Sequence, residues 1–587
     1  MAFRMTVRSL SIPDSDRWLG ALTTTSSFLS NRFPTAVQDV EALSARVDRV
    51  KARFPKTERL PLCEALAAGL SAHGAGTVAV QAAQSLADPE TLCLVTGQQP
   101  GVLLSPFYSV VKAAGTVAQA RCLGRELGRN VVPVFWTATE DHDVGEVERA
   151  RLMATRGEDG EMDVHLWQPI PRGRFPVGGL DTRDALARML CRIETAPALP
   201  GVFRSDVLAL AHDLIGSHPT LGGHFMALMN RVFDGTPLVV LDPMDPSLRA
   251  LAAPMFSRLL REGRAVADAV RAGSENLLAA SGEAGVQAPW REGESGVFYL
   301  VEGQRAMLER EGFTPEGPNG DRGPMPEADE RLLPRGRPDL ARRRGEWAEE
   351  ALEHPERFSS DVHLRPLIQE SLLPVIGVVL GPGETRYWAQ LTELFSAMDL
   401  EMPAALPRAR VTLVPPHVQS LLGKLSLSVE AVVSDWQGGL ERILAERDRI
   451  GIAGRFEKYE EDVRGLHAAL MADLEPLGKD FARHGSPNLA RHLEAVSWLR
   501  AKALKSHREG NDTLIRRFKT VGNYLAPQGQ PQDRYWSAFT FLAQEGINLG
   551  TRLAMQDELA RPGLLGVWTG AHEAEVGVGD PVLCSTR

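Results

Sequence analysis

Residues 91–146 decide the fold and read TLCLVTGQQPGVLLSPFYSVVKAAGTVAQARCLGRELGRNVVPVFWTATEDHDVGE. Within them, residues 92–95 and 131–136 are two short apolar runs of the kind that form buried strands. Between these runs, residues 107–127 carry apolar side chains at helical spacing. A strand, a helix and a strand of this length predict a βαβ unit with parallel strands, the building block of an α/β fold.

Two signals mark the ends of the expected helix. Ser105-Pro106 predicts its start, because serine is a favoured N-cap and proline is tolerated at the first helical position. Gly128 predicts its end, because glycine readily adopts the left-handed conformation found at helix C-termini.

An acidic cluster, Glu140, Asp141, His142 and Asp143, directly follows the second strand. Ligands of parallel sheets bind outside the carboxyl ends of the strands, so this cluster is the candidate catalytic group. Its carboxylates and histidine could bind a divalent cation, orient an amine, or keep His142 protonated as an acid. We predict no metal site of the zinc type, because a second histidine or cysteine at ligand spacing is missing. The alternative is a solvated acidic loop.

The loop after the first strand, TGQQPG, should lie at the same edge of the sheet. Its glycines would let backbone N–H groups approach a ligand, and a helix N-terminus carries partial positive charge. The loop is neither a Walker A motif nor a G-x-G-x-x-G motif. The alternative is a structural turn with Lys112 on the surface. The expected substrate- or nucleotide-binding residues are Thr96, Gly97, Gln98, Gln99, Gly101, Tyr108 and Lys112.

A third group of candidates lies where the apolar pattern resumes, after about residue 358. Residues 374–380 predict a buried strand, followed by a Gly-Pro-Gly turn and a helix. Arginines there suit bidentate recognition of carboxylate or phosphate. A glutamate there could accept an ammonium group or cap the helix. The residues concerned are Arg365, Gly381, Gly383, Glu384 and Arg386.

These motifs resemble those of one known family. TGQQPG, SPFYSVVK and PVFWTATEDHD are followed by RPLIQESLLP (365–374), GPGETRYWAQL (381–391) and MPAALPRARVT (402–412). The series is similar to that of the bacillithiol biosynthesis cysteine-adding enzymes, a family of cysteine ligases. The resemblance implies a Rossmann-like parallel-sheet core like that of class I aminoacyl-tRNA synthetases, with two insertions and a C-terminal α-helical coiled coil.

The resemblance also implies a reaction, the addition of L-cysteine to glucosaminyl-malate. An amide bond needs an activated carboxyl group, so ATP with Mg²⁺ is the expected co-substrate. By analogy with nucleotidylyl transferases, Tyr108 would stand where those enzymes place a histidine. The segment PRARVT (407–412) would correspond to a basic phosphate-binding loop. Two residues depart from the family pattern, Ser105 in place of glycine and Arg410 in place of serine.

Composition limits the possible classes of protein. The 587 residues are 43% hydrophobic and 24% charged, which is ordinary for a globular chain of several domains. The net charge of −10 does not favour a nucleic-acid partner, and no apolar run reaches about 18 residues. The five cysteines are scattered and form no C-x-x-C pair, which fits a reducing compartment. We expect a cytoplasmic protein that does not span a membrane.

Residues 456–484 predict one half of a helical hairpin, and residues 488–518 predict the returning half after Ser486-Pro487. Each helix has only about three heptads, so the seam needs further packing from the core or from another subunit. We expect a homodimer through this hairpin. The a/d-type seam consists of Val463, Leu466, Leu470, Leu474, Leu477 and Phe481.

The remaining segments follow from changes in pattern along the chain. Within residues 236–246, Leu238 to Leu241 predict a buried strand. Asp242 and Asp245 follow it as turn residues that cap the next helix. The expected segments are an N-terminal helical lead-in (1–90), the first βαβ unit (91–150), a first insertion (151–202), core (203–261), a second insertion (262–345), core (346–415), the helical hairpin (416–525) and a C-terminal segment (526–587).

Two other functions stay open at this point. One is an adenylate-forming or nucleotidyl-transferring enzyme that acts on another small acid. The other is a coiled-coil scaffold with a catalytically inert core. The sequence indicates neither how a carboxyl group would be activated nor which residue would act as the general base.

Overall fold

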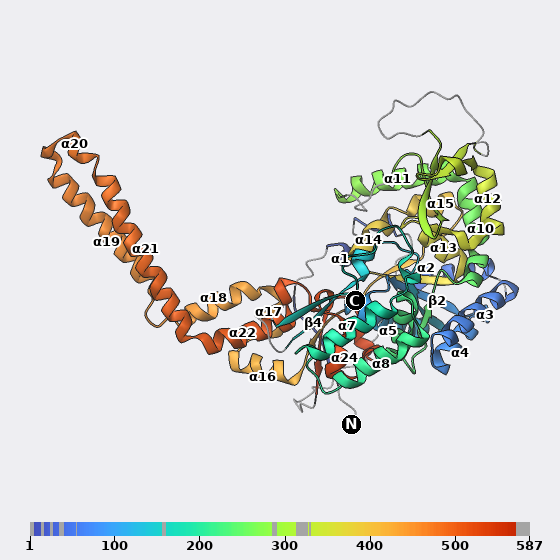
Figure 1. Ribbon diagram of the computed structural model, residues 1–587, viewed down its shortest axis with the longest axis horizontal. Coiled ribbons are helices and arrows are strands. Elements are labelled where there is room, and N and C mark those ends of the chain that lie inside the picture. Colours follow the sequence, from blue (N-terminus) through green and yellow to red (C-terminus); the bar gives the residue numbers. More distant parts are fainter. Residues whose placement is uncertain are drawn as a thin grey trace. The chain divides into compact units, whose positions relative to one another are not determined.

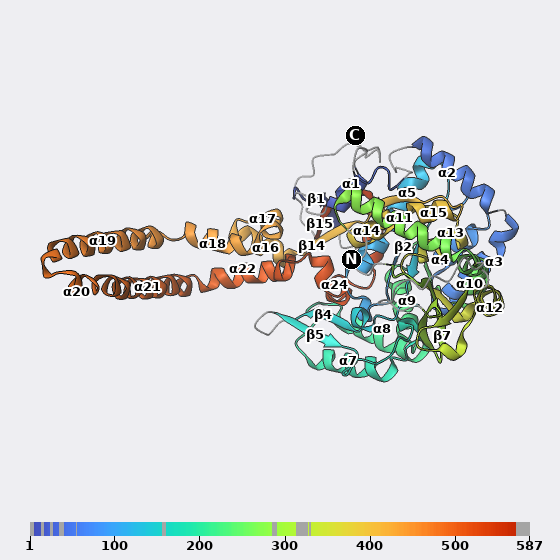
Figure 2. The ribbon, with the colours of Figure 1, turned by 90° about the horizontal axis from the view of Figure 1, so that it is seen from above.

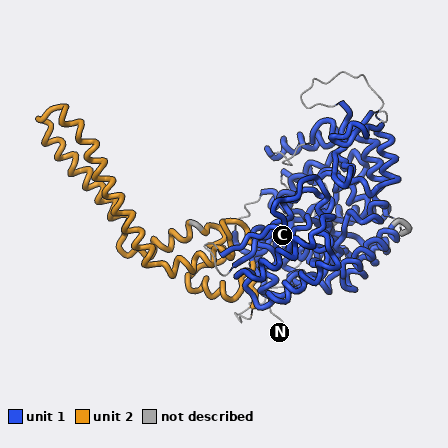
Figure 3. Tube along the Cα trace, viewed as in Figure 1, with its two compact units in different colours: residues 1–412, 533–567, 571–587 blue, residues 413–532, 568–570 orange. Residues whose placement is uncertain are grey.

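The computed structural model describes residues 5–12, 17–23, 28–33, 40–54, 56–154, 160–283, 290–312, 327 and 330–570. Parts of the predicted N-terminal lead-in, of both insertions and of the C-terminal segment lie outside these residues. The chain divides into two compact units, which are described separately (Figure 3). The first comprises residues 1–412, 533–567 and 571–587, and the second comprises residues 413–532 and 568–570.

The first unit is built on a five-stranded parallel sheet of order β13-β12-β2-β3-β6. The predicted βαβ unit is confirmed, because β2 pairs in parallel with β3 and α5 (Tyr108–Leu127) joins them (Figure 1). All residues of β3 and β12 are buried, as expected for parallel strands covered on both faces. The strands are β2 (Leu92–Gln98), β3 (Val131–Thr137), β6 (Val239–Leu241), β12 (Val375–Leu380) and β13 (Ala404–Pro407).

Helices cover both faces of this sheet. Leu92 and Leu94 pack in the apolar cluster with α2 (Val40–Arg53) and α5. Cys93 and Val95 point the other way, into a larger cluster with α3 (Lys56–Ala72), α4 (Thr77–Ser85) and α10 (Pro246–Arg261). This alternation follows from the two-residue period of a strand.

Helix α5 ends where the sequence predicts but begins later. Gly128 is its C-cap, with a left-handed φ of 61°. The predicted N-cap at Ser105 is wrong, because Phe107 holds the cap position and makes no side-chain cap hydrogen bond. Ser105 instead lies buried in a turn that only a glycine at position 101 permits. A Cβ atom on Gly101 would lie 1.8 Å from the carbonyl oxygen of Ser105.

The first insertion contains an antiparallel pair, β4 (Arg149–Met153) and β5 (Glu161–His165), followed by α7 (Arg183–Thr195). The second contains an antiparallel β-hairpin of β7 (Glu294–Val301) and β8 (Gln304–Arg310). This hairpin belongs to an antiparallel sheet of order β10-β9-β8-β7-β11. Its other strands are β9 (Arg331–Pro334), β10 (Arg342–Arg343) and β11 (Phe358–Ser360).

Another sheet and a further set of helices lie wholly or mainly in the first unit. A three-stranded sheet has the order β1-β15-β14, with β1 at Met5–Ser9, β15 at Leu564–Thr569 and β14 at Arg410–Val414. The helices are α1 (Arg17–Leu22), α6 (Val144–Val147), α8 (Arg204–Ser217), α9 (Leu221–Val232), α11 (Gly263–Ser281), α12 (Arg344–Glu353), α13 (Arg365–Leu372), α14 (Pro382–Ala389), α15 (Thr392–Ala397), α23 (Gln532–Tyr535), α24 (Ala538–Glu545) and α25 (Leu549–Ala554).

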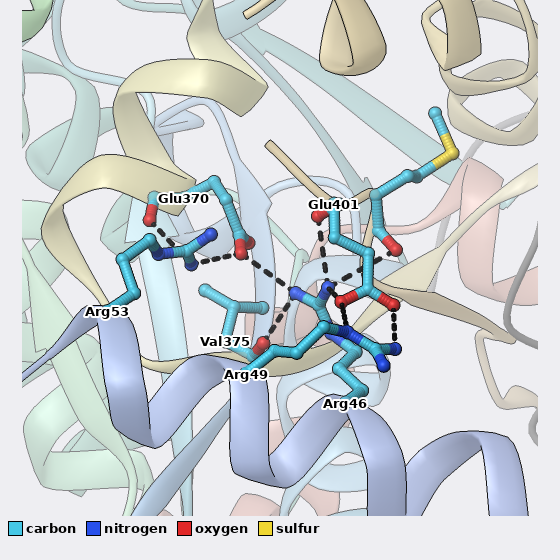
Figure 4. Close-up of polar contacts among 7 residues, drawn as sticks. Arg46, Arg49, Arg53, Glu370, Val375 and Glu401 are labelled. Carbon is cyan, nitrogen blue, oxygen red and sulfur yellow. Dashed lines mark hydrogen bonds and ion pairs between the residues drawn. The ribbon is translucent and has the colours of Figure 1, made fainter. Parts of the chain in front are cut away.

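Two arginines of α2 form hydrogen bonds to Glu370 of α13 (Figure 4). Nη2 of Arg46 donates to Oε1 of Glu370 at 2.8 Å and to the carbonyl of Val375 at 2.7 Å. Arg53 also donates to the Glu370 carboxylate. The side chains of Arg46 and Glu370 are fully buried. Because α13 begins with Arg365, this network also fixes the position of a candidate site residue.

The second unit is helical, and its hairpin is confirmed. Helices α19 (Ile452–Asp473) and α21 (Gly485–Gly510) lie side by side (Figure 2). The first helix ends earlier than predicted, and short turns including α20 (Lys479–Ala482) form the tip. The other helices are α16 (Pro416–Leu425), α17 (Val429–Ser434), α18 (Trp436–Glu446) and α22 (Asp512–Leu525).

The predicted seam between the two long helices is only partly correct, because Val463 and Leu474 are partly buried but other members are exposed. Leu466, Leu470 and Leu477 are 74%, 55% and 59% exposed, so they do not form the seam. The partly buried positions of α19 include Val463, His467 and Met471. A Cβ atom on Gly485 of α21 would lie 2.9 Å from Cε of Met471, which shows that this row faces α21. Within the described residues, no helix is long and apolar enough to cross a membrane.

Candidate active site

The loops after β2 and β3 meet at the carboxyl edge of the parallel sheet. Gln98 lies opposite Thr137 at the ends of the two paired strands. Nε2 of Gln99 donates to Oδ2 of Asp141 at 2.9 Å and also to Glu146. The structure therefore brings TGQQPG and the acidic cluster together, as the sequence predicts.

Glu140 is paired with an arginine of α10. Its Oε2 accepts a hydrogen bond from Nη2 of Arg249 at 2.6 Å, and the two side chains are 7% and 5% exposed. Nη1 of Arg249 also donates to the carbonyl of Phe358. Glu140 therefore neutralises a buried cation and joins the core loop to β11, which leaves it poorly placed to act as a free base.

His142 lies between two arginines. Its Nδ1 is 3.0 Å from Nη1 of Arg305, and its Nε2 is 2.8 Å from Nη2 of Arg174. Burial, together with the charges of Arg305 and then Arg174, lowers the pKa of His142 to about 4. The interpretation of His142 as a protonated acid is therefore wrong, because the imidazole is neutral near pH 7.

Asp141 and the nearby Glu146 lie beside Gln99, and Asp143 lies at the start of α6. Asp141 accepts from Gln99 and lies 3.8 Å from Nη1 of Arg305. Asp143 occupies the cap position of α6 without a side-chain cap hydrogen bond. Burial, and then the charge of Asp143, raises the pKa of Glu146. These three carboxylates form the negatively charged part of the site.

Lys112 is a buried residue that connects β2 to α14, and it does not lie on the surface. Its side chain is 1% exposed, and Nζ donates to the carbonyl of Gly97 at 2.6 Å and to Oε2 of Glu384 at 2.5 Å. Burial lowers the pKa of Lys112, while Glu384 acts in the opposite direction. Oε2 of Glu384 also accepts from the backbone N–H of Gly381, which confirms the capping role of this glutamate at α14.

Arg365 and Tyr108 lie near the ion pair of Lys112 and Glu384. The guanidinium of Arg365 donates to the hydroxyl of Tyr387, and the charge of Arg365 acts on Lys112. The guanidinium of Arg408, from PRARVT, lies 5.2 Å from the centre of the Tyr108 ring. Burial raises the pKa of Tyr108 to about 12, so the phenol stays protonated near pH 7.

Several predicted binding residues serve the fold. Thr96 is buried, and its hydroxyl donates to the carbonyl of Val379 at 3.1 Å. A Cβ atom on Gly97 would lie 2.6 Å from the carbonyl oxygen of Trp136, so the two strands need glycine there. A Cβ atom on Gly383 would meet no atom within 4 Å, so packing does not require that glycine.

Among the described residues, the side chain of Arg386 forms no hydrogen bond or ion pair with another candidate site residue. Its guanidinium lies 3.5 Å from Glu283 and stacks 5.3 Å from the ring centre of Trp18. The charged residues that sequence reasoning missed are Arg174 in the first insertion, Arg305 in the second and Arg249 in α10. None lies in a motif at a strand end, so no local signal identifies them.

The fold and the site can now be compared with known proteins. Residues 5–319 and 328–409 match the model of the N-terminal Rossmann-like domain of the bacillithiol biosynthesis protein BshC. Residues 411–558 match the model of the BshC C-terminal coiled-coil domain. The chain belongs to the BshC family. The expected Rossmann-like core and C-terminal coiled coil are thus confirmed, whereas the likeness to class I synthetases stays a prediction.

Curated BshC relatives cover most of the chain. A protein of Symbiobacterium thermophilum is 33% identical over 510 residues, which span 84% of this chain and 87% of the relative. A protein of Heliobacterium modesticaldum is 30% identical over 549 residues, with 90% and 94% covered. Both carry the name "Putative cysteine ligase BshC".

Proposed function

We propose that this chain is a cysteine ligase of bacillithiol biosynthesis, which joins the carboxyl group of L-cysteine to the amino group of glucosaminyl-malate. Membership of the BshC family, which spans both domains, supports the reaction class. The observation that carries the proposal is the arrangement of charge around Gln99 and His142. Gln99 donates to the carboxylates of Asp141 and Glu146, and the guanidinium groups of Arg174 and Arg305 lie at the two nitrogens of His142.

Such an arrangement suits the two substrates. Asp141, Asp143 and Glu146 would attract an ammonium group, either of cysteine or of glucosamine. The positive charges of Arg305 and Arg365 would attract carboxylates or phosphates to this site. Holding an amine and a carboxyl group side by side is a large source of rate acceleration for a reaction between two substrates.

We include ATP and Mg²⁺ in the proposal as the source of carboxyl activation. The cysteine carboxylate would attack a phosphorus atom of ATP and release pyrophosphate or ADP. The glucosamine nitrogen would then attack the activated carbonyl carbon and release AMP or phosphate. Mg²⁺ bound mainly by phosphate and water needs only one or two protein carboxylates, which Asp141 and Asp143 could supply.

The proposal extends to assembly and location. The exposed leucines of α19 offer an apolar surface for a second hairpin, so we propose a homodimer through the second unit. We place the enzyme in the cytoplasm, where ATP and free cysteine are supplied.

The test is a direct assay of the product. Purified protein is incubated with L-cysteine, ATP, Mg²⁺ and glucosaminyl-malate, and the amide is sought by mass spectrometry. A cysteine-dependent product of the correct mass is expected. If no amide forms while an active relative works under the same conditions, the ligase proposal is wrong. Isotope exchange between pyrophosphate and ATP with another small acid would then favour an adenylate-forming enzyme.

A further inference from the structure

Arg174 and Arg305 approach the two nitrogens of one imidazole from separate insertions. Nη1 of Arg305 lies 3.0 Å from Nδ1 of His142, and Nη2 of Arg174 lies 2.8 Å from Nε2. A guanidinium group only donates hydrogen bonds, and a neutral imidazole has one donor nitrogen and one acceptor nitrogen. Whichever tautomer is present, one of the two contacts therefore sets a donor against a donor.

The surroundings show which contact lacks an acceptor. Arg305 is 4% exposed and firmly held, because Nε donates to the hydroxyl of Ser359 at 2.9 Å and Nη2 donates to the carbonyl of Ser360 at 2.7 Å. Its remaining Nη1 is directed at Nδ1 of His142. A donation from Nη1 to Nδ1 would place the proton of His142 on Nε2, where it faces the guanidinium of Arg174.

Arg174 has hydrogen-bonding capacity that is not used by a carboxylate. Among the described residues, no acidic side chain forms an ion pair with its guanidinium within 4.0 Å. Burial, and then the charge of Arg335, lowers the pKa of Arg174, while Glu294 acts in the opposite direction. The ring of Phe298 lies beneath both guanidinium groups, at 4.1 Å from Arg305 and 5.8 Å from Arg174.

The backbone fixes Arg174 at this place. Its carbonyl accepts from the N–H of Arg305 at 2.8 Å, and its own N–H donates to the side chain of Gln304 at 3.3 Å. The preceding Gly173 has a φ of 113°, a conformation that other residues rarely adopt. The first insertion is thus attached to β8 of the second directly beside the histidine.

We propose that Arg174, together with the Nε2–H of His142, binds a carboxylate group of the substrate. The carboxylate supplies the acceptor that both donors lack, while Arg305 fixes the tautomer from the other side. The inference rests on the proposed function for the identity of this group, which is the malate part of glucosaminyl-malate. Cysteine is excluded from this position, because its carboxyl group must remain free to react.

We call this carboxylate-binding pair, Arg174 and His142, the clamp. Calorimetry with glucosaminyl-malate, in the absence of cysteine and ATP, tests whether it binds this substrate. Arg174→Met should weaken binding at least tenfold, since it removes a charged, forked donor. Arg172→Met is the matched control, because it removes an exposed arginine of the same segment and should change binding less than twofold. Arg174→Lys keeps the charge but not the fork, and should bind between the wild type and Arg174→Met.

Two competition experiments identify the group that the clamp holds. L-malate should compete with glucosaminyl-malate in the wild type and fail to compete in Arg174→Met, whereas methyl glucosaminide should not compete. Inorganic phosphate that competes better than L-malate would overturn the proposal and point to a nucleotide phosphate. Equal weakening by Arg172→Met and Arg174→Met would also overturn it, because the binding would then come from general electrostatic attraction.

The kinetic readout distinguishes this clamp from the ligase proposal itself. In the complete reaction, Arg174→Met should raise KM for glucosaminyl-malate about tenfold and leave KM for cysteine unchanged. Binding measured without ATP does not depend on catalysis, so the clamp can be confirmed even if the ligase assay gives no product. A wild type that does not bind glucosaminyl-malate contradicts the clamp, whatever the assay shows.

Discussion

Glu140 and Arg249 form a buried ion pair, with 2.6 Å between Oε2 and Nη2, at the centre of the candidate site. The pair joins the loop after β3 to α10, and Arg249 continues to the carbonyl of Phe358 at the start of β11. A carboxylate in this position holds together three parts of the site. Its first role is therefore structural, and its effect on catalysis acts through the placement of its neighbours.

Removing the charge of Glu140 should cost stability. Glu140→Gln leaves the guanidinium of Arg249 buried without its counter-charge, and we expect the free energy of unfolding to fall by about 3 kcal/mol. Urea denaturation measures this loss, with Asp143→Asn as a control in which no side-chain cap hydrogen bond is removed. Unchanged stability together with a large loss of kcat would instead identify Glu140 as a free general base.

His142 should make folding sensitive to acid. Its pKa is about 4 in the folded chain and near its ordinary value of 6.5 when unfolded. Between these two values the unfolded chain binds the proton more readily, so the free energy of unfolding falls as the pH is lowered from about 6.5 to about 4. Above about pH 6.5 the histidine is neutral in both states and has no such effect.

Urea unfolding of the wild type and of His142→Gln, at pH 7 and at pH 4.5, measures this effect. The variant cannot titrate at this position and should lose less stability on acidification than the wild type. His224, whose pKa burial also lowers to about 4, contributes equally to both proteins. The same acid sensitivity in both proteins, or an NMR titration of His142 near 6.5, would contradict the arrangement of the two arginines.

The arginines of α2 offer a comparison between a buried and an exposed ion pair (Figure 4). Arg46→Met leaves the fully buried Glu370 with only Arg53, and should lower the free energy of unfolding by about 3 kcal/mol. Arg49→Met removes two hydrogen bonds to Glu401 from a side chain that is 55% exposed, and should cost less than about 1 kcal/mol. Equal losses in the two variants would show that burial does not determine the strength of this network.

The exposed leucines of the hairpin test the proposed homodimer. Leu470 and Leu477 are 55% and 59% exposed in the protomer, so changing both to Asp should leave the folded protomer intact. In a dimer the same changes would bury charge and should give a monomer. Light scattering with sedimentation measures the mass of each protein. A monomeric wild type would contradict the proposed homodimer. Circular dichroism of the variant checks that its helices remain folded.

The parallel core was predictable because its signals are local. The apolar runs at 92–95 and 131–136 and the terminal Gly128 each act through neighbouring residues, and the structure has strands and a C-cap there. The start of α5 was not predictable in the same way. Ser105 and Pro106 carry a capping signal, but the tight turn closed by Gly101 places the cap at Phe107.

The site was predictable only where its residues follow core strands. TGQQPG and the acidic cluster could be placed together, because the carboxyl ends of neighbouring parallel strands meet. Arg174 and Arg305 reach His142 from insertions that lie 32 and 163 residues away in sequence, a contact that depends on tertiary structure. The prediction of the hairpin seam was partly wrong for a related reason. The spacing placed Leu466 and Leu470 in the seam, but the row that packs against α21 contains Met471.

The central claim, that ATP activates the cysteine carboxyl for amide formation, is tested most directly with L-cysteine labelled with ¹⁸O in both carboxyl oxygens. The purified protein is incubated with this cysteine, ATP, Mg²⁺ and glucosaminyl-malate, and the masses of all products are measured by mass spectrometry. The account predicts one ¹⁸O atom in the amide carbonyl and one in AMP or phosphate for each amide formed. Absence of the amide, or an amide formed without label in AMP or phosphate, would contradict it.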